Sequence, residues 1–273
     1  MQNLLRLLAW NASELFVFGL IMVMLQVFLS AHQGQKMWDR SSAIDIAYSF
    51  ILTFCTPFFY LVPVAIVEQM VQQNPTLATL PERLSGDLPF WVQVFMAVFI
   101  IDFISYWRHR LMHCRWLWPI HAIHHCSKRL DWLSTERFHI LNHFITLTIN
   151  VVPTQLLLGP EAAILGTILR RFYNFLIHAN VRLDYGIASY VFVSPRFHHW
   201  HHSTDAMAAN KNYCTFFSCI DWVFGTFYLP ENKRYPENVG ESDNIKENII
   251  VQFLHPFQVW FSWLGRYMGT SIK

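Results

Sequence analysis

Long apolar stretches recur along the chain and predict several membrane-spanning helices. A helix needs about 20 mostly apolar residues to cross the hydrocarbon core of a bilayer. Gly159 and Pro160 signal a turn between two further apolar arms, which indicates a hairpin that enters the membrane and returns. The predicted spans are residues 15–31, 43–67 (interrupted by Pro57 and Pro63) and 88–107, followed by the hairpin 140–177. We therefore expect an all-α, multi-pass transmembrane helical bundle.

The polar connections predict the orientation of this bundle, because lysine and arginine near span ends favour the cytoplasmic side. Residues 108–139 are basic and rich in histidine, and the hairpin returns the chain to the same side. The 68–87 loop, on the other side, is acidic. We expect a helical cap on the cytoplasmic side that carries the histidines. We expect Arg170 and Arg171 to anchor the hairpin at the interface, with pairing to an acidic group or a lipid phosphate as the alternative.

The C-terminal region predicts a different kind of membrane contact. Residues 249–265 are rich in aromatic side chains, but His255–Pro256 breaks the apolar pattern. We expect an interfacial segment there rather than a further span. The first residues lack a basic region followed by a small-residue cleavage site, so we expect no removed signal peptide. No polar linker divides the chain, and we treat residues 1–273 as a single integral membrane domain.

The composition agrees with a lipid environment. Apolar residues make up 53% of the chain and charged residues only 14%, whereas soluble domains carry roughly a quarter charged residues. The net charge of +2 is too small to indicate a nucleic-acid partner. The five cysteines show no CxxC spacing, which argues against a disulfide framework and against a thiolate zinc site.

Clustered histidines are the main chemical feature of the chain. Residues at i, i+3 and i+4 share one face of a helix, so each cluster can aim several imidazoles at one point. A single HxxxH pair is weak evidence of a metal site, but several clusters on one predicted membrane side are strong evidence. One metal takes about three to six ligands, so nine imidazoles indicate two metals. The nine are His109, His113, His121, His124, His125, His178, His198, His201 and His202.

The ligand type leaves several metals open, because imidazole suits iron, zinc, copper and nickel. A zinc protease of the HExxH type needs a glutamate after its first histidine, and Arg110 occupies that position here. A haem needs only one or two axial histidines. A metal transporter would place its ligands within the spans. Two redox irons that handle dioxygen fit best, with a non-oxygenase protein, such as a zinc-dependent hydrolase or metal transporter, as the alternative.

The motifs around these histidines closely resemble the fatty acid hydroxylase/sterol desaturase superfamily. The first runs from Asp102 to His113 (DFISYWRHRLMH) and is followed by LWPIHAIHH, which ends at His125. The last box is PRFHHWHHS, from Pro195 to Ser203, and DWVFGT follows it at residues 221–226. The resemblance covers residues 88–230, which we take as the catalytic region.

The resemblance implies a membrane enzyme with two iron ions that hydroxylates, desaturates or cleaves a lipid. It implies dioxygen as the oxidant and a separate electron donor or reductase. The nine histidines named above would be the metal ligands, and zinc could replace iron during purification. The lipid, the carbon that reacts and the type of product stay open at this point.

Four further residues are expected near the metals. Asn174 stands where relatives often have a histidine, so it is a candidate for a water-mediated ligand. His199 is an extra histidine that its spacing directs away from its neighbours. His139 is a candidate neighbour of the site. Asp102 lies two helical turns before His109 and is a candidate to orient a ligating histidine.

Overall fold

The structure, a computed structural model, describes residues 2–232, 234–240 and 245–267, and within them all regular secondary structure is helical. Its α-helices are α1 (Gln2–Leu29), α2 (Arg40–Gln73), α3 (Leu80–Ser85), α4 (Phe90–Met112), α5 (Trp118–His125), α6 (Ile140–Leu158), α7 (Pro160–His178), α8 (Pro195–His201), α9 (Ser218–Val223) and α10 (Ile249–Tyr267). The 3-10 helices are η1 (Pro75–Thr79), η2 (Trp132–Glu136), η3 (Gly186–Tyr190) and η4 (Ala206–Ala208).

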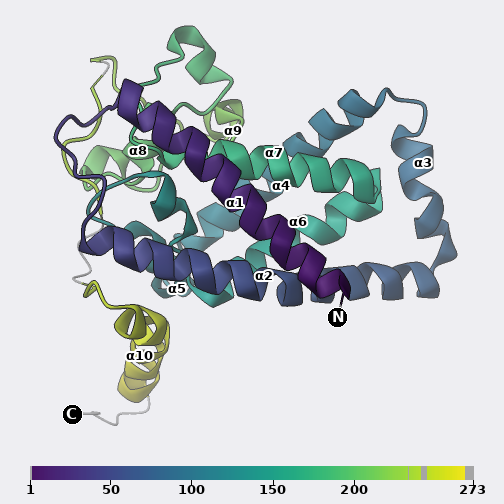
Figure 1. Cartoon of the computed structure of the whole chain (residues 1–273). Coiled ribbons are helices and arrows are strands. Elements are labelled where there is room, and N and C mark those ends of the chain that lie inside the picture. The colour runs from purple at the N-terminus through teal and green to yellow at the C-terminus, as the bar shows by residue number, and fades with distance from the viewer. Residues whose placement is uncertain (1, 233, 241–244, 268–273) are drawn as a thin grey trace.

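The long helices form an elongated bundle with different elements at its two ends (Figure 1). Helix α3 lies at one end, and α5 and α8 lie at the other. Four helices are long and apolar enough to cross a membrane, and each coincides with a predicted span or hairpin arm. They cover Leu5–Leu29, Arg40–Gln73, Phe90–Met112 and Ile140–Leu158. The all-helical, multi-pass architecture expected from the sequence is confirmed.

Proline interrupts fewer helices than we predicted. Helix α2 continues across Pro57 and Pro63, and α10 continues across Pro256, so both expected breaks were wrong. A proline removes one backbone donor and crowds the preceding turn. Neighbouring helices and side chains compensate for this loss in membrane helices.

The hairpin brings α7 alongside α4. Gly159 joins α6 to α7 with φ +80°, a conformation that favours glycine. Helix α7 packs against α4, and a Cβ atom added at Gly166 would lie 2.7 Å from the Cβ atom of Ala97. Because both helices run toward the same end, the hairpin returns His178 to the end of the bundle where α4 carries His109.

The two arginines at the centre of α7 form buried ion pairs instead of anchoring the hairpin at the interface. The Arg170 guanidinium lies 3.4 Å from the carboxylate of Asp102. Arg171 contacts Glu14 of α1 at 2.9 Å and Glu136 of η2 at 3.3 Å. Asp102 and Glu136 are buried and the Glu14 side chain is 8% exposed, and buried charges need partners in a low-dielectric interior. Our expectation of interfacial anchors was therefore wrong, and these pairs connect α7 to the core.

A further buried ion pair joins the segment before α6 to α2. The Arg137 guanidinium lies 2.5 Å from the Asp45 carboxylate, and both side chains are fully buried. Arg137 also donates to the carbonyl and hydroxyl of Ser41. This segment follows α5, so the pair holds the chain in place just beyond the second histidine cluster.

Candidate metal centre

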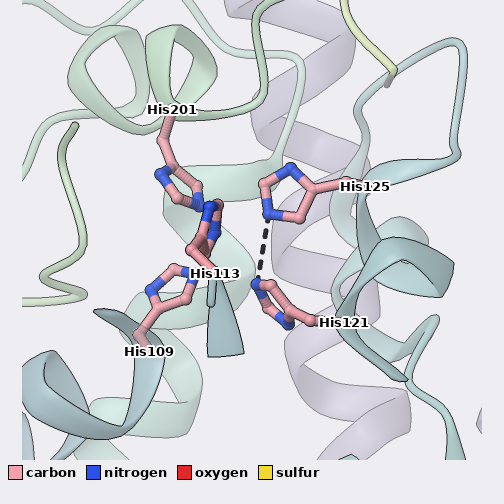
Figure 2. Close-up of side chains that lie close together, drawn as sticks. All are labelled: His109, His113, His121, His125 and His201. Atoms are coloured by element: carbon pink, nitrogen blue, oxygen red, sulfur yellow. Dashed lines mark hydrogen bonds between the residues drawn. The ribbon is translucent and has the colours of Figure 1, made fainter. Parts of the chain in front are cut away.

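The nine predicted ligands converge at one end of the bundle in two groups. They come from α4, α5, α7 and α8 and from the residues that follow α4 and α8. In each group, one donor nitrogen of every histidine lies within 4.8 Å of the others. The first group is His109, His113, His121, His125 and His201, shown in Figure 2, and the second is His124, His178, His198 and His202.

Two clusters have the spacing HxxHH, one in α5 and one in the last box, and each contributes histidines to both groups. In α5, His121 and His125 join the first group and His124 joins the second. In the last box, His201 joins the first group, whereas His198 and His202 join the second. Residues at i and i+4 are about 40° apart around a helix, and i+3 falls on the other side of i. The two groups therefore lie side by side, and the rings of His125 and His202 have centroids 4.4 Å apart.

In the first group, backbone carbonyls hold the outer nitrogens of two histidines. His109 Nδ1 donates to the carbonyl of Tyr213 at 2.7 Å, and His201 Nδ1 donates to that of Lys211 at 2.7 Å. A carbonyl oxygen only accepts, so the proton is on Nδ1 and each Nε2 keeps its lone pair. Both Nε2 atoms are buried without a hydrogen-bond partner, as is that of His113. Unpaired acceptors of this kind fit a metal ion, and a carbonyl on the other ring nitrogen is typical of metal-bound histidine.

In the second group, four Nε2 atoms lie in a chain of close contacts. His178 Nε2 lies 3.1 Å from His124 Nε2 and 3.0 Å from His198 Nε2, which lies 3.2 Å from that of His202. His178 donates from Nδ1 to the Asn174 carbonyl at 2.8 Å, so its Nε2 is an acceptor. Two nitrogens bound at about 2.1 Å and at right angles are about 3.0 Å apart. The spacing therefore matches neighbouring ligands of one ion.

Burial keeps these histidines in the neutral form that binds metal. Desolvation is the largest cause that lowers the pKa of His121, and the neighbouring histidines lower it further. Desolvation lowers the pKa of His201 to about 4. Neutral imidazole is the ligand form of histidine. The same desolvation lowers the pKa well below its usual value in His113, His124, His125, His198 and His202.

Comparison with known proteins gives this arrangement a context. The model of the fatty acid hydroxylase family matches residues 94–226, which include all nine histidines. The resemblance to this family that the motifs predicted is therefore confirmed over residues 94–226. No solved structure matches the chain.

Several lipid enzymes are similar to part of the chain. Ornithine lipid hydroxylase OlsE of Rhizobium tropici is 31% identical over 62% of this chain and 51% of its own length. Alkylglycerol monooxygenase of Homo sapiens is 30% identical over 65% of this chain and 39% of its own length. Methylsterol monooxygenase 2-2 of Arabidopsis thaliana is 27% identical over 79% of this chain and 82% of its own length. The chain thus spans about half or less of the first two relatives.

Asp102, a residue of the family motif, acts on a loop rather than directly on a histidine. Its carboxylate accepts hydrogen bonds from the backbone N–H groups of residues 215–217 at 2.7 to 3.1 Å. Asp221 accepts from those of Tyr213 and Cys214 at 2.8 and 2.9 Å. The carbonyl of Tyr213 in turn accepts from His109, so both carboxylates shape the loop that orients this ligand.

Two of the additional histidines lie outside both metal groups. His199 Nε2 donates to the carbonyl of Ala179 at 3.1 Å, and its ring stacks with that of His32. His139 caps α6: its Nδ1 accepts from the Leu141 N–H, and its Nε2 donates to the carbonyl of Phe253 in α10. His199 Nε2 and both ring nitrogens of His139 are thus engaged in contacts that position backbone segments around the centre.

Several other residues lie around the centre that the sequence analysis did not identify. Phe138 stacks on the ring of His124, with centroids 4.3 Å apart and planes 10° apart. The Asn142 amide nitrogen lies 3.4 Å from His121 Nδ1. Asn210 and Asn212 have positive φ angles of 57° and 61° and flank the Lys211 carbonyl that binds His201. Two asparagines around one residue are a sequence signal for such a turn, because asparagine tolerates this conformation.

Proposed function

We propose that this chain is a membrane-bound di-iron oxygenase that oxidises a C–H bond of a lipid. The observation that carries the proposal is the partition of nine histidines, eight of them buried and His113 half-buried, into two adjacent groups of five and four. One group would hold each iron. Iron bound there would supply the reduction of dioxygen and the oxidation of an unactivated carbon. Insertion of one oxygen atom, with release of the other as water, also consumes two electrons and two protons, which a separate donor would deliver.

The chain's own residues prepare the site for this chemistry. Backbone carbonyls hold a proton on the outer nitrogens of His109, His178 and His201, so the inner nitrogens remain available to metal. Burial of the histidines excludes water from the two groups. The centre lies at the end of helices that are long and apolar enough to span the bilayer, and a lipid reaches it from the membrane.

Two further parts of the proposal rest on the relatives and on charge. The named relatives act on an ornithine lipid, an alkylglycerol and a methylsterol, which supports a lipid as the substrate class. The histidine end of the bundle carries the basic residues of the 108–139 segment, and the 68–87 loop at the other end is acidic. The distribution of charge supports the cytoplasmic side for the metal centre.

A zinc hydrolase is the runner-up and needs a carboxylate base beside a metal-bound water. Both metal groups of the described residues consist of histidines alone. The nearby carboxylates of Asp102 and Asp221 accept hydrogen bonds from backbone N–H groups. This ligand set favours the oxygenase.

Isotope labelling of lipids separates the two functions. Whole membranes from cells that express the chain, which retain the host's electron donors, would be incubated under ¹⁸O₂ and their lipids analysed by mass spectrometry. We expect a lipid that gains ¹⁸O from the gas, and no such product from the His124→Ala/His201→Ala double variant. His199→Gln serves as the matched control and keeps the product. Label that comes from H₂¹⁸O instead of ¹⁸O₂, or lipids identical to those of the double variant, would contradict the proposal.

A further inference from the structure

An apolar groove of about 490 Å³ lies between α4 and α7, away from the metal centre. Its walls include Phe90 and Val94 of α4, Leu165 and Leu169 of α7, and Phe216. No lining residue is charged. The volume is within the range of pockets that bind small organic molecules, and the chemistry of its walls selects a hydrocarbon.

Aromatic side chains line the groove on the side of α7. The rings of Tyr173 and Phe216 are tilted against each other, with centroids 4.3 Å apart. The polar side-chain groups of the lining are the Trp91 indole N–H and the Tyr173 hydroxyl, and the hydroxyl donates to the carbonyl of Val193 at 2.7 Å. A ligand in the groove therefore meets mainly apolar atoms.

The groove is continuous with the surface that α4 presents to the membrane. Its rim residues are exposed, with Trp91 at 73% and Phe95 at 55% of their full exposure. Both lie on a helix that is long and apolar enough to span the bilayer. The lining residues of α4 end at Val98, and His109 lies about 16 Å further along the helix axis. On α7 the lining reaches Tyr173, about 8 Å along the helix axis from His178, so the groove lies beside the middle of the helix pair and includes none of the nine histidines.

We propose that this groove binds one acyl chain of a bilayer phospholipid, as a site separate from the metal centre. The membrane supplies such chains at high local concentration, and every wall of the groove offers them apolar contact. The chain would pack against both helices of a pair that carries one ligand of each metal group, His109 on α4 and His178 on α7. The bound lipid would therefore support the helix pair through residues other than the histidines.

Photocrosslinking of the full chain in phosphatidylcholine vesicles tests this proposal. The probe is a phosphatidylcholine with a diazirine in one acyl chain, and adducts are located by peptide mass spectrometry. We expect the adducts to concentrate on residues 90–98 and 165–173, above the level on the exposed surface of α2. Adducts spread evenly over all exposed apolar residues would overturn the proposal.

Variants that fill the groove with a larger side chain test whether the labelling depends on the groove. Leu169→Trp or Leu165→Trp places a large ring in the groove and should remove the excess of adducts. Leu61→Trp, at an exposed position of α2, should leave the excess unchanged. Circular dichroism and gel filtration select the filled variant that keeps the wild-type fold. Undiminished labelling in that variant would contradict the site. The assay needs neither metal nor turnover, so its result is independent of the proposed oxygenase function.

Discussion

Asp102 and Asp221 between them accept hydrogen bonds from five consecutive backbone N–H groups, those of residues 213–217. The two carboxylates come from different helices, α4 and α9, and meet on the same loop. The carbonyl at the start of this loop, that of Tyr213, accepts from His109 Nδ1. The pair thus links the conformation of a loop to the orientation of one metal ligand.

Neutralising one of these carboxylates should weaken the first metal group selectively. In Asp221→Asn, one backbone N–H group loses its acceptor, and the carbonyl that orients His109 is free to shift. Loss of an indirect contact of this kind lowers metal affinity roughly 10- to 100-fold. Metal occupancy of the purified protein, measured after dialysis against chelators of increasing strength, should fall for one metal per chain and stay constant for the other. The exposed-loop variant Asp87→Asn is the control. Equal loss of both metals would contradict a selective role.

His199 should be dispensable for metal binding although it stands between ligands in the sequence. Its Nε2 donates to the Ala179 carbonyl, and glutamine can supply the same donor. His199→Gln should therefore keep the metal content of the wild type, whereas His198→Gln should lose metal from the second group. Elemental analysis of both proteins checks this. Metal loss in a folded His199→Gln protein would mean that the ligand set is assigned incorrectly.

The contact of α7 with α4 makes Gly166 sensitive to size. An alanine there gains about 1 kcal/mol in helix propensity. Its Cβ atom, however, would lie 2.7 Å from that of Ala97, and overpacking of this kind costs about 1–3 kcal/mol. We expect a net loss of stability, seen as a lower midpoint of thermal unfolding in detergent. Ala97→Gly in the same chain should restore most of it. A Gly166→Ala protein as stable as the wild type would show that α4 and α7 are not in close contact.

The buried Arg137–Asp45 pair should behave as a coupled unit. Removing one partner, as in Arg137→Met, leaves an uncompensated charge in the interior and costs about 3–5 kcal/mol of the free energy of unfolding. Replacing both, as in Arg137→Met/Asp45→Leu, should cost less than the single change. Denaturant unfolding of the four proteins of this double-mutant cycle measures the coupling. Additive effects would contradict the ion pair.

Length and apolar content were enough to predict the spans and the hairpin, because only helices satisfy the backbone in hydrocarbon. The same pattern could not show that α2 and α10 pass through their prolines, since neighbouring elements decide whether a lost backbone bond is tolerated. It also gave no sign that Arg170 and Arg171 pair with Asp102, Glu14 and Glu136. Those partners lie 35 or more residues away in the chain.

Helical spacing predicted which histidines gather but not how they divide. The interval between His121, His124 and His125 shows that all three can face one region. The assignment of His124 to a different group depends on how α5 is rotated against α7 and α8, which is a tertiary property. Likewise, the spacing of Asp102 and His109 placed them on one face of α4, but the loop that joins their functions comes from more than 100 residues later.

Metal content tests the central claim most directly. The full chain would be purified in detergent, loaded with Fe²⁺ under anaerobic conditions and analysed for iron per chain, together with His113→Ala/His125→Ala and His178→Ala/His202→Ala. Two groups of histidines predict about two irons in the wild type and about one in each double variant. A wild-type chain that binds no iron, or a single iron that either double variant removes completely, would contradict a centre built from two separate histidine groups.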